Sequence, residues 1–538
     1  MPEVAVAAAY LQPIAPVGGS VAWSALVAVL PLLSMLVLLA VFRVKSHAAA
    51  AAALVVALVL AVVVYEMPPL SAVSAGLEGA AFGVFPIMWT VLGAVWVYRL
   101  TVESGHFDVL TRAFARVSPD PRILTIVIAF LFGALLEAVA GFGTPIVVST
   151  VVLIGAGLPP VRAAAAALLA NSVVTPLGVM GTPILTMSKV SEIPVEEIGP
   201  VVARQVCLLA VFVPLLLVAV VGGARGVRQV WPAALVVGVA FGSAQFLCAS
   251  YLAVGLSNIA AAAAGLLALL VLLRVWTPQS VAARRAPERA YDTPRHTVEA
   301  FAPYALIVVV FLLTRTGPIE AVLAHTTVPF SWPGLDVRTA SGDVPAAETF
   351  TFNPLTAPGT LVFAAGLVSI AVLRVQVGDA ARCLAAAVVQ LRWSFATVTA
   401  VLALAYVMNL SGQTATIGQF LAGAGAAFAL LSPLLGWLGV VVTGSNTASN
   451  AMFGNLQVSA AQQAGSNPTV LVAGNMAGGS AGTPIALQNL ALVSSVKGLA
   501  GRDGLLLRRL WPISLAAVAL LAVLVWLQTT DVLSWMVV

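Results

Sequence analysis

Apolar runs long enough to cross a lipid bilayer recur along almost the whole of this 538-residue chain. Lipid cannot hydrogen-bond an exposed backbone, so each run is predicted to be an α-helix of roughly 17–25 residues. The chain is therefore predicted to be an all-α polytopic membrane protein with about 12–14 transmembrane helices. We place uninterrupted spans near 23–42, 50–65, 82–98, 205–222, 230–250, 253–273, 300–314, 359–373, 393–409, 425–442 and 511–528.

The composition excludes several other classes of protein. Hydrophobic residues make up 61% of the chain and charged residues 8%, against about 45–50% and about 25% in soluble domains. So few charges exclude a disordered chain, a secreted disulfide scaffold and a nucleic-acid binder. The three cysteines are predicted to be small buried hydrophobes, and the four histidines share no spacing that would bind a metal. We predict no metal, no cofactor and no catalytic residues.

The loops predict the orientation. Six loops carry clustered Arg and Lys and are predicted to be cytoplasmic, whereas the acidic segment 315–357 and residues 67–80 are predicted to be external. No Lys or Arg precedes Arg43, so the first apolar run is predicted to be a retained helix with an external N-terminus. These assignments place the chain in the cytoplasmic (inner) membrane. They also require 122–204 and 410–497 to cross it in opposite directions, as in inverted-repeat transporters.

We divide the chain into five segments on this basis. Two hairpin-bearing transport repeats, 122–204 and 410–497, alternate with three other segments: scaffold helices at 1–121, further scaffold helices at 205–409 and a C-terminal helix at 498–538. The middle scaffold segment contains the cytoplasmic loop 275–299 and the external loop 315–357.

Both repeats are interrupted by polar residues in a matching order. The first has a Gly-rich segment at 136–145, then Asn171, then Gly181-Thr182-Pro183; the second has 443–450, Asn475 and Gly482-Thr483-Pro484. We interpret this as a weak internal repeat. Gly and Pro clusters at membrane depth predict broken helices or re-entrant hairpins that line a cavity. The N-terminal ends of such half-helices offer unpaired N–H groups that hold an anion.

A small carboxylate is therefore the predicted ligand. The alternative is that these small residues only let helices pack closely. Glu137 is the main acid within the apolar runs. A charge at the bilayer centre costs on the order of 2.5–3.5 kcal/mol, so an acid there is functional, paired or protonated. We hypothesise that Glu137 couples transport to a proton gradient. The alternatives are a protonated acid bonded to nearby backbone, or an interfacial position.

Two motifs resemble those of the L-lactate permease family. Residues 136–145, which read Leu-Glu-Ala-Val-Ala-Gly-Phe-Gly-Thr-Pro, resemble the family's Leu-Glu-Gly-x-x-Gly-Phe-Gly-x-Pro motif. Residues 432–439, running into 443–450 and Phe453, resemble its second signature. The likeness extends from about residue 20 to the C-terminus. The positions that match the two motifs and a later Pro-x-x-x-Gln stretch are Glu137, Gly141, Phe142, Gly143, Thr144, Pro145, Gly444, Ser445, Asn446, Thr447, Ser449, Asn450 and Gln488.

The resemblance implies import of lactate, glycolate or a similar short 2-hydroxymonocarboxylate together with a proton. It also implies the architecture of the ion-transporter superfamily, in which hairpin-bearing domains move against a scaffold like an elevator. The chain departs from the family pattern at two charged positions. Asn446 stands where Asp is common, and Gly482-Thr483 stands where relatives often have Gly-Lys. If those charges pair in relatives, their joint loss is compensatory; if the Lys binds the carboxylate, the substrate or affinity differs.

The sequence thus predicts a secondary transporter of a small organic anion and a proton, with no enzyme activity and no nucleic-acid partner. Glu137 is predicted to carry the proton. A sodium-coupled or dicarboxylate carrier, an anion channel and a membrane-embedded enzyme remain as alternatives, and the oligomeric state, with a homodimer as one option, stays open. The residues predicted to bind the substrate are Gly143, Thr144, Asn171, Ser445, Asn446, Thr447, Ser449, Asn450, Asn475, Thr483 and Gln488.

Overall fold

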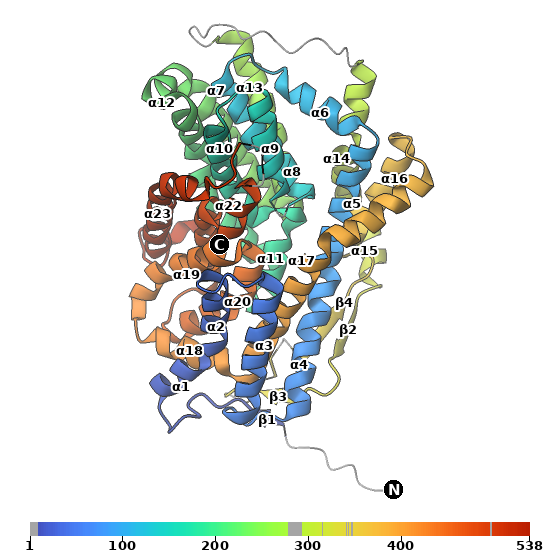
Figure 1. The fold of residues 1–538 in the computed structure, drawn as a ribbon. Coiled ribbons are helices and arrows are strands. Elements are labelled where there is room, and N and C mark those ends of the chain that lie inside the picture. Colours follow the sequence, from blue (N-terminus) through green and yellow to red (C-terminus); the bar gives the residue numbers. More distant parts are fainter. Residues whose placement is uncertain are drawn as a thin grey trace.

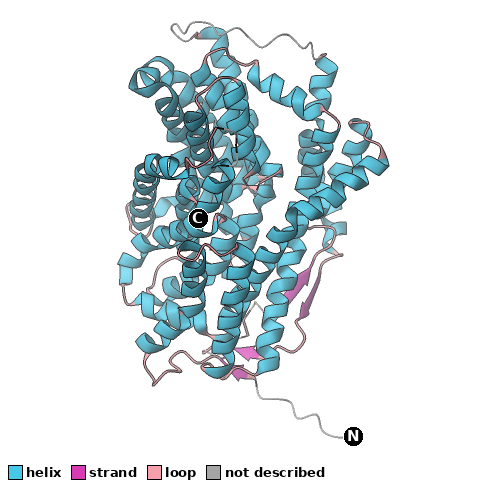
Figure 2. Ribbon diagram, in the orientation of Figure 1, coloured by secondary structure: helices cyan, strands magenta, loops and turns pink. Residues whose placement is uncertain are grey.

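The computed structural model describes residues 9–141, 143–277, 293–314, 316–340, 342, 344–345, 348–494, 496 and 498–537. Phe142 of the first motif and most of the basic loop 275–299 lie outside these residues, so the predictions made for them are not tested. Within the described residues, eleven helices are long and apolar enough to cross a membrane. The predicted all-α polytopic fold is confirmed, and the few strands are short (Figure 2).

The first part of the chain is helical from residue 21 onward (Figure 1). Its elements are α1 (Val21–Ala28), α2 (Leu30–Ala40), α3 (Ser46–Val63), α4 (Pro69–Phe82), the π-helical turn η1 (Gly83–Met88), α5 (Trp89–Glu103) and α6 (His106–Ala115). We predicted an external loop at 67–80, and this was wrong because those residues form most of α4. Pro69 begins the helix at a position where its missing N–H costs no hydrogen bond.

The first interrupted stretch contains two helix breaks. Its elements are α7 (Pro121–Thr125), η2 (Ile126–Phe132), α8 (Gly133–Val139), α9 (Thr144–Gly155), α10 (Pro160–Val174), the short turns η3 (Thr175–Leu177) and η4 (Val179–Gly181), and α11 (Thr182–Ser191). The chain leaves helical geometry between α8 and α9 and again between α10 and α11.

The middle of the chain carries further spans and the short strands. Its elements are α12 (Val195–Tyr251), η5 (Val254–Leu256), α13 (Ser257–Val275), α14 (Pro294–Thr314), α15 (Gly317–Ala324), β2 (Val328–Ser331), β3 (Val337–Arg338), β4 (Thr349–Phe352), α16 (Pro358–Val372) and α17 (Val377–Ser411). The 57-residue α12 is a hairpin of two spans because Gly223 turns the chain at φ +64°. Its two arms touch closely: a Cβ at Gly238 would lie 2.7 Å from the Val211 carbonyl oxygen.

Two small sheets lie in the lower half of Figure 1, on the acidic segment that we predicted to be external. Strand β2 pairs antiparallel with β4, and β3 pairs parallel with β1 (Tyr10–Leu11) near the N-terminus. The helix α6, which lies within the basic segment predicted as a cytoplasmic loop between Arg99 and Arg122, is near the opposite end (Figure 1).

The second interrupted stretch repeats the pattern of the first. Its elements are α18 (Gln413–Ala422), η7 (Gly425–Ala427), α19 (Phe428–Thr443), α20 (Asn446–Gln463), α21 (Pro468–Gly482), η8 (Thr483–Ile485) and α22 (Leu487–Ser494); the chain then continues through α23 (Asp503–Gln528) to η9 (Ser534–Met536). Helices α19 and α20 are separated by a break at Gly444, and α21 and α22 by η8.

The interrupted helices lie in the centre of the molecule. In the most apolar 18-residue segment of each span, the protein buries 100% of the residues in Pro121–Val139 and 94% in Pro160–Ser191. The corresponding share is 28% in both Ser46–Val63 and Pro294–Thr314. Backbone that leaves helical geometry at membrane depth is tolerated only where protein or a water-filled cavity surrounds it. The broken segments therefore occupy the positions where a break is tolerated.

Glycines allow two helices of the second stretch to pack backbone against backbone. A Cβ on Gly478 of α21 would overlap the carbonyl of Pro433 on α19, and a Cβ on Gly436 of α19 would overlap the carbonyl of Asn475 on α21. In lipid, such close approach of small residues is a main source of helix–helix attraction. This packing sets the distance between the two arms that carry the breaks.

We expect Gly478→Ala to destabilise the protein, because the added methyl must force α19 and α21 apart. Overpacking of this kind costs about 1–3 kcal/mol, which should lower the thermal unfolding midpoint of the purified protein in detergent by several degrees. Gly504→Ala on α23 is the control, since nothing lies within 4 Å of a Cβ there. Equal midpoints for the two variants would contradict the packing described.

Candidate functional site

The breaks of both stretches border one cavity of about 430 Å³. Two kinds of element line it: the broken helices of the two interrupted stretches, and the helices α2, α3 and α17 outside those stretches. The lining residues are Met35, Lys45, Ser46, His47, Glu137, Gly143, Asn171, Thr175, Val179, Pro183, Trp393, Ser394, Thr397, Val398, Thr443, Gly444, Ser445, Asn446, Thr447, Ala448, Gln488 and Asn489.

The first break presents an acid and an amide to the cavity. Glu137 lies in the last turn of α8 and is 5% exposed. The side-chain amide of Asn171, from α10, hydrogen-bonds to its carboxyl group. The second carboxyl oxygen of Glu137 and the side-chain oxygen of Asn171 have no partner among the described residues. Both residues line the cavity, and these two side-chain oxygens are buried. A buried polar atom without a partner costs free energy unless a ligand or water satisfies it.

Glycines make room for this acid. A Cβ on Gly178 would lie 2.8 Å from the Glu137 Oε1 atom, and Gly143 holds a left-handed φ of +80° at the start of α9. Val179 and Met180 also have positive φ, at 40° and 55°. Non-glycine residues in this region carry strain, which concentrates at functional sites.

The second break presents the N-terminus of α20. Gly444, at φ +74°, ends α19, and Ser445 caps α20 by accepting a hydrogen bond of 3.2 Å from the Ala448 N–H. Asn446 is the first residue of the helix and is 5% exposed. Both atoms of its side-chain amide lack a partner among the described residues. A helix N-terminus with an unpaired amide beside it offers donors to an anion and one acceptor to a hydroxyl.

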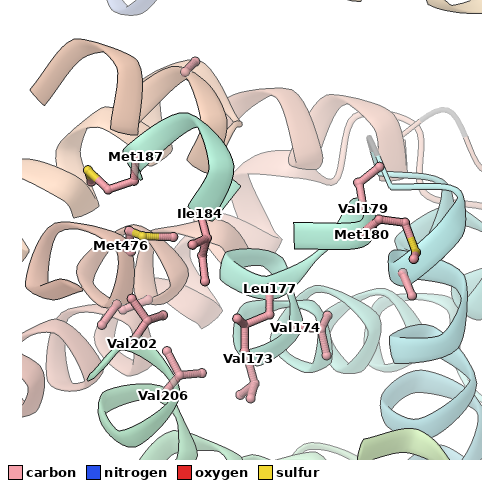
Figure 3. Packing of buried hydrophobic residues seen from close by; sticks show 14 of the residues in the cluster. Val173, Val174, Leu177, Val179, Met180, Ile184, Met187, Val202, Val206 and Met476 are labelled. Carbon is pink, nitrogen blue, oxygen red and sulfur yellow. The ribbon is translucent and has the colours of Figure 1, made fainter. Parts of the chain in front are cut away.

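The two remaining breaks touch each other. The hydroxyl groups of Thr175, in η3, and Thr483, in η8, lie 3.2 Å apart. The Thr-Pro of each turn follows directly on a long helix, so the structure pairs Thr175-Pro176 with Thr483-Pro484. The sequence comparison had paired Gly181-Thr182-Pro183 with that segment instead. Apolar side chains surround the break between α10 and α11: Val173 and Leu177 lie toward Val206 of α12, and Met180 lies beside Val179 (Figure 3).

The structure brings six of the eleven predicted binding residues to the cavity, together with Glu137. The six are Gly143, Asn171, Ser445, Asn446, Thr447 and Gln488. Thr144, Ser449, Asn450, Asn475 and Thr483 are not part of its lining.

Four of those five join helices to one another. Asn450 donates to the Pro183 carbonyl at 2.9 Å, and Asn475 donates to the Asn450 side-chain oxygen at 3.1 Å. Ser449 donates to the Gly436 carbonyl at 3.2 Å, and Thr483 pairs with Thr175. The contacts of Asn450 with Pro183 and of Thr483 with Thr175 join the two interrupted stretches, and the other two join helices of the second stretch.

The lining residues contributed by α2, α3 and α17 were missed. Lys45 and His47 are the basic residues among the described lining, and the His47 ring stacks on Trp393 of α17 with centroids 4.2 Å apart. Lys45 was predicted only as part of a basic loop on the cytoplasmic side. The polar positions Ser394 and Thr397, one turn apart on an otherwise apolar run, were the signal that α17 borders a cavity.

Comparison with known proteins identifies the family. The chain matches the family described as L-lactate permease over residues 24–532. It is 35% identical to the glycolate permease GlcA of Escherichia coli (strain K12), covering 95% of this chain and 97% of that protein. It is 32% identical to the L-lactate permease of Bacillus subtilis (strain 168), covering 98% and 100%. It is 33% identical to the L-lactate permease of Escherichia coli (strain K12), covering 96% and 98%.

The geometry of the second break predicts which positions water reaches. In a variant with Cys207, Cys248 and Cys383 replaced, we expect Thr447→Cys to react readily with a water-soluble maleimide, because residue 447 lines the cavity. Ser449→Cys, two residues along the same helix, is fully buried against Gly436 and should stay unlabelled. Equal labelling rates of the two cysteines, measured by mass spectrometry, would disprove this placement of the cavity.

Proposed function

Because this chain belongs to the L-lactate permease family, we propose that it is a secondary transporter that imports L-lactate, glycolate or a related short 2-hydroxymonocarboxylate by proton symport. The relatives are named as permeases of lactate and glycolate, in line with the prediction of a transporter that is not an enzyme. The observation that supports the substrate class is the buried Asn446 amide, unpartnered at the N-terminus of α20.

The substrate's two polar groups match the cavity's two unsatisfied regions. A carboxylate at the N-terminus of α20 receives N–H donors and the favourable end of the helix dipole. The Asn446 amide donates to that carboxylate while its oxygen accepts the 2-hydroxyl group. Gly143, Asn171, Ser445, Thr447 and Gln488 complete the binding site in this proposal.

Glu137 is the proton carrier in this proposal. Its carboxyl group is buried beside Asn171 and shares the cavity with the Asn446 amide. Protonation of Glu137 removes the negative charge of the one acid among the described lining residues, so an anionic substrate enters without repulsion from that acid. Each ligand therefore favours binding of the other, and the two are carried together.

The architecture proposed for this transport is an inverted repeat. In Figure 1, α8, α9 and α10 lie in the upper half and α18, α19 and α20 in the lower half, which supports opposite orientations of the two hairpins. We propose that 122–204 and 410–497 form the moving transport repeats, and that 1–121 and 205–409 supply the scaffold. The basic loops orient the chain with its N-terminus outside the cytoplasmic membrane.

The neutral residues at 446 and 483 are proposed to be a compensated pair. A Cβ on Gly479 would overlap the Asn446 side chain, and the Thr483 hydroxyl donates to the Gly479 carbonyl at 3.4 Å. Both positions therefore lie against the same turn of α21. An Asp at 446 and a Lys at 483 would neutralise each other there, so the two neutral residues keep the same net charge.

The test is uptake of labelled L-lactate, glycolate and succinate into proteoliposomes. We expect an inward-directed proton gradient to drive accumulation of the two monocarboxylates and not of succinate, with no effect when choline replaces sodium. Loss of uptake without sodium would favour a sodium-coupled carrier. Preference for succinate would favour a dicarboxylate carrier. Movement only down the substrate's own gradient would indicate a channel.

We predict that Glu137→Gln abolishes accumulation of lactate against its gradient, because the amide cannot carry a proton. Exchange of labelled for unlabelled lactate at equal concentrations should persist, since the amide keeps the neutral shape of the protonated acid. The control is Glu103→Gln, an exposed acid at the end of α5. Accumulation by the Glu137→Gln protein would remove this residue as the coupling group.

We predict that Asn446→Asp lowers lactate affinity about tenfold at neutral pH, because the added charge repels the carboxylate by about 1.4 kcal/mol. Adding Thr483→Lys to this variant should restore most of the lost lactate affinity. The single variant Thr483→Lys shows the effect of the cation without the acid. Titration of the purified protein with lactate measures all three variants. Additive losses in the double variant would contradict the compensated pair.

A further inference from the structure

A second buried acid lies outside the cavity. Glu78 is in α4 and is 0% exposed, and neither of its carboxyl oxygens has a hydrogen-bond partner among the described residues. The sequence analysis missed it because 67–80 was interpreted as a loop. Nothing in the proposed transport mechanism so far uses this group.

The acid is enclosed by tight helix packing. Its neighbour Gly79 has no room for a Cβ because the Leu402 carbonyl of α17 occupies that space, and Gly76 packs on Val407 of the same helix. The Tyr406 hydroxyl, also on α17 and also without a partner, is fully buried nearby. The acid therefore lies in a dry contact between two scaffold helices.

One cation faces this acid, and it comes from a transport repeat. Lys189 of α11 interacts electrostatically with Glu78 but forms no ion pair with it among the described contacts. Its ammonium group donates instead to the Thr349 carbonyl at 3.1 Å and lies 5.8 Å from the Phe82 ring centroid. Phe82 follows Glu78 by four residues on α4, so the two side chains share a face one turn apart.

The remaining charged and titratable groups around the acid are few. Glu348 faces it from the segment before β4, and Tyr406 faces both Glu78 and Glu192, which follows α11. A buried carboxylate with neither a hydrogen bond nor an ion pair is strongly disfavoured. Glu78 therefore carries its proton in this conformation, and it needs the Lys189 ammonium beside it to lose that proton.

We propose that Glu78 is a second proton-binding group of this transporter, and that it releases its proton when movement of α11 brings the Lys189 ammonium against its carboxylate. This rests on the proposed function for the coupling of the proton to lactate. On release, the carboxyl O–H bond breaks and the proton passes to water in the cavity of about 350 Å³ that Phe82 and Lys189 line. The carboxylate then pairs with the ammonium, and no other group changes its charge.

Protonation is tested without any substrate. Infrared difference spectra of the purified wild-type protein across a pH jump should contain the carbonyl stretches of buried protonated carboxyl groups. Glu78→Gln should remove the contribution that remains in Glu137→Gln, while Glu103→Gln keeps the wild-type signal. Persistence of the full signal in Glu78→Gln overturns the inference. If Glu78→Gln removes the Glu78 signal but the wild-type protein transports no lactate, the inference stands and the proposed function is overturned.

The pairing with Lys189 is tested by transport. We expect Lys189→Gln to slow proton-driven lactate uptake about tenfold, because Glu78 then has no counterion when it must release its proton, and to leave lactate exchange within about twofold of wild type. Glu78→Gln/Lys189→Gln should recover to the rate of Glu78→Gln alone, since no charge is left unpaired. Independent, multiplicative losses in the double variant would overturn the pairing, and so would wild-type uptake by Lys189→Gln.

Discussion

The need of every backbone polar group for a partner inside an apolar medium governs this structure. A continuous helix meets that need alone, and the peripheral spans are of this kind. The chain breaks its helices at Ala140–Gly143, at η3 and η4, at Gly444 and at η8, and all of these positions lie in the buried centre. There, side chains of other helices satisfy some of the released carbonyl groups: Asn258 of α13 donates to the Val174 carbonyl, at the end of α10, at 2.8 Å. The cavity lies beside the breaks, where the chain leaves helical geometry.

Close packing of small residues makes the arrangement possible. The contacts of Gly436 and Gly478 bring α19 and α21 to backbone distance, and Gly178 and Gly479 leave no atoms where Glu137 and Asn446 need space. The polar side chains divide accordingly. Asn450 and Asn475, on helix faces, bond to neighbouring helices, whereas the side-chain amide of Asn446, beside a break, stays unpaired among the described residues.

That division explains what the sequence could predict. Apolar run length predicted the spans, and the Gly and Pro clusters predicted the interruptions, because both are local properties. Asn446 and Asn171 line the cavity, whereas Asn450 does not, and its partner, the Pro183 carbonyl, is 267 residues away in the chain. Lys45 and His47 reach the cavity only through the packing of α3 against α17, which no local pattern encodes. Glu78 was missed because the Pro- and Ser-containing segment around it resembles a loop, and only the close fit of Gly76 and Gly79 to α17 shows it to be a buried helix.

The two buried acids differ in what surrounds them, and this difference assigns them different tasks in the proposed cycle. Glu137 lies at a break, beside Asn171 and in the same cavity as Asn446, so its proton and the substrate's charge affect each other directly. Glu78 lies in a continuous helix, outside the lining of that cavity, and the cation that faces it belongs to another helix. Its charge therefore depends on the position of α11 rather than on occupancy of the cavity. A transporter that couples two ligands needs both kinds of dependence. The protonation of one group must depend on whether substrate occupies the cavity, and that of the other must depend on the position of the moving helices.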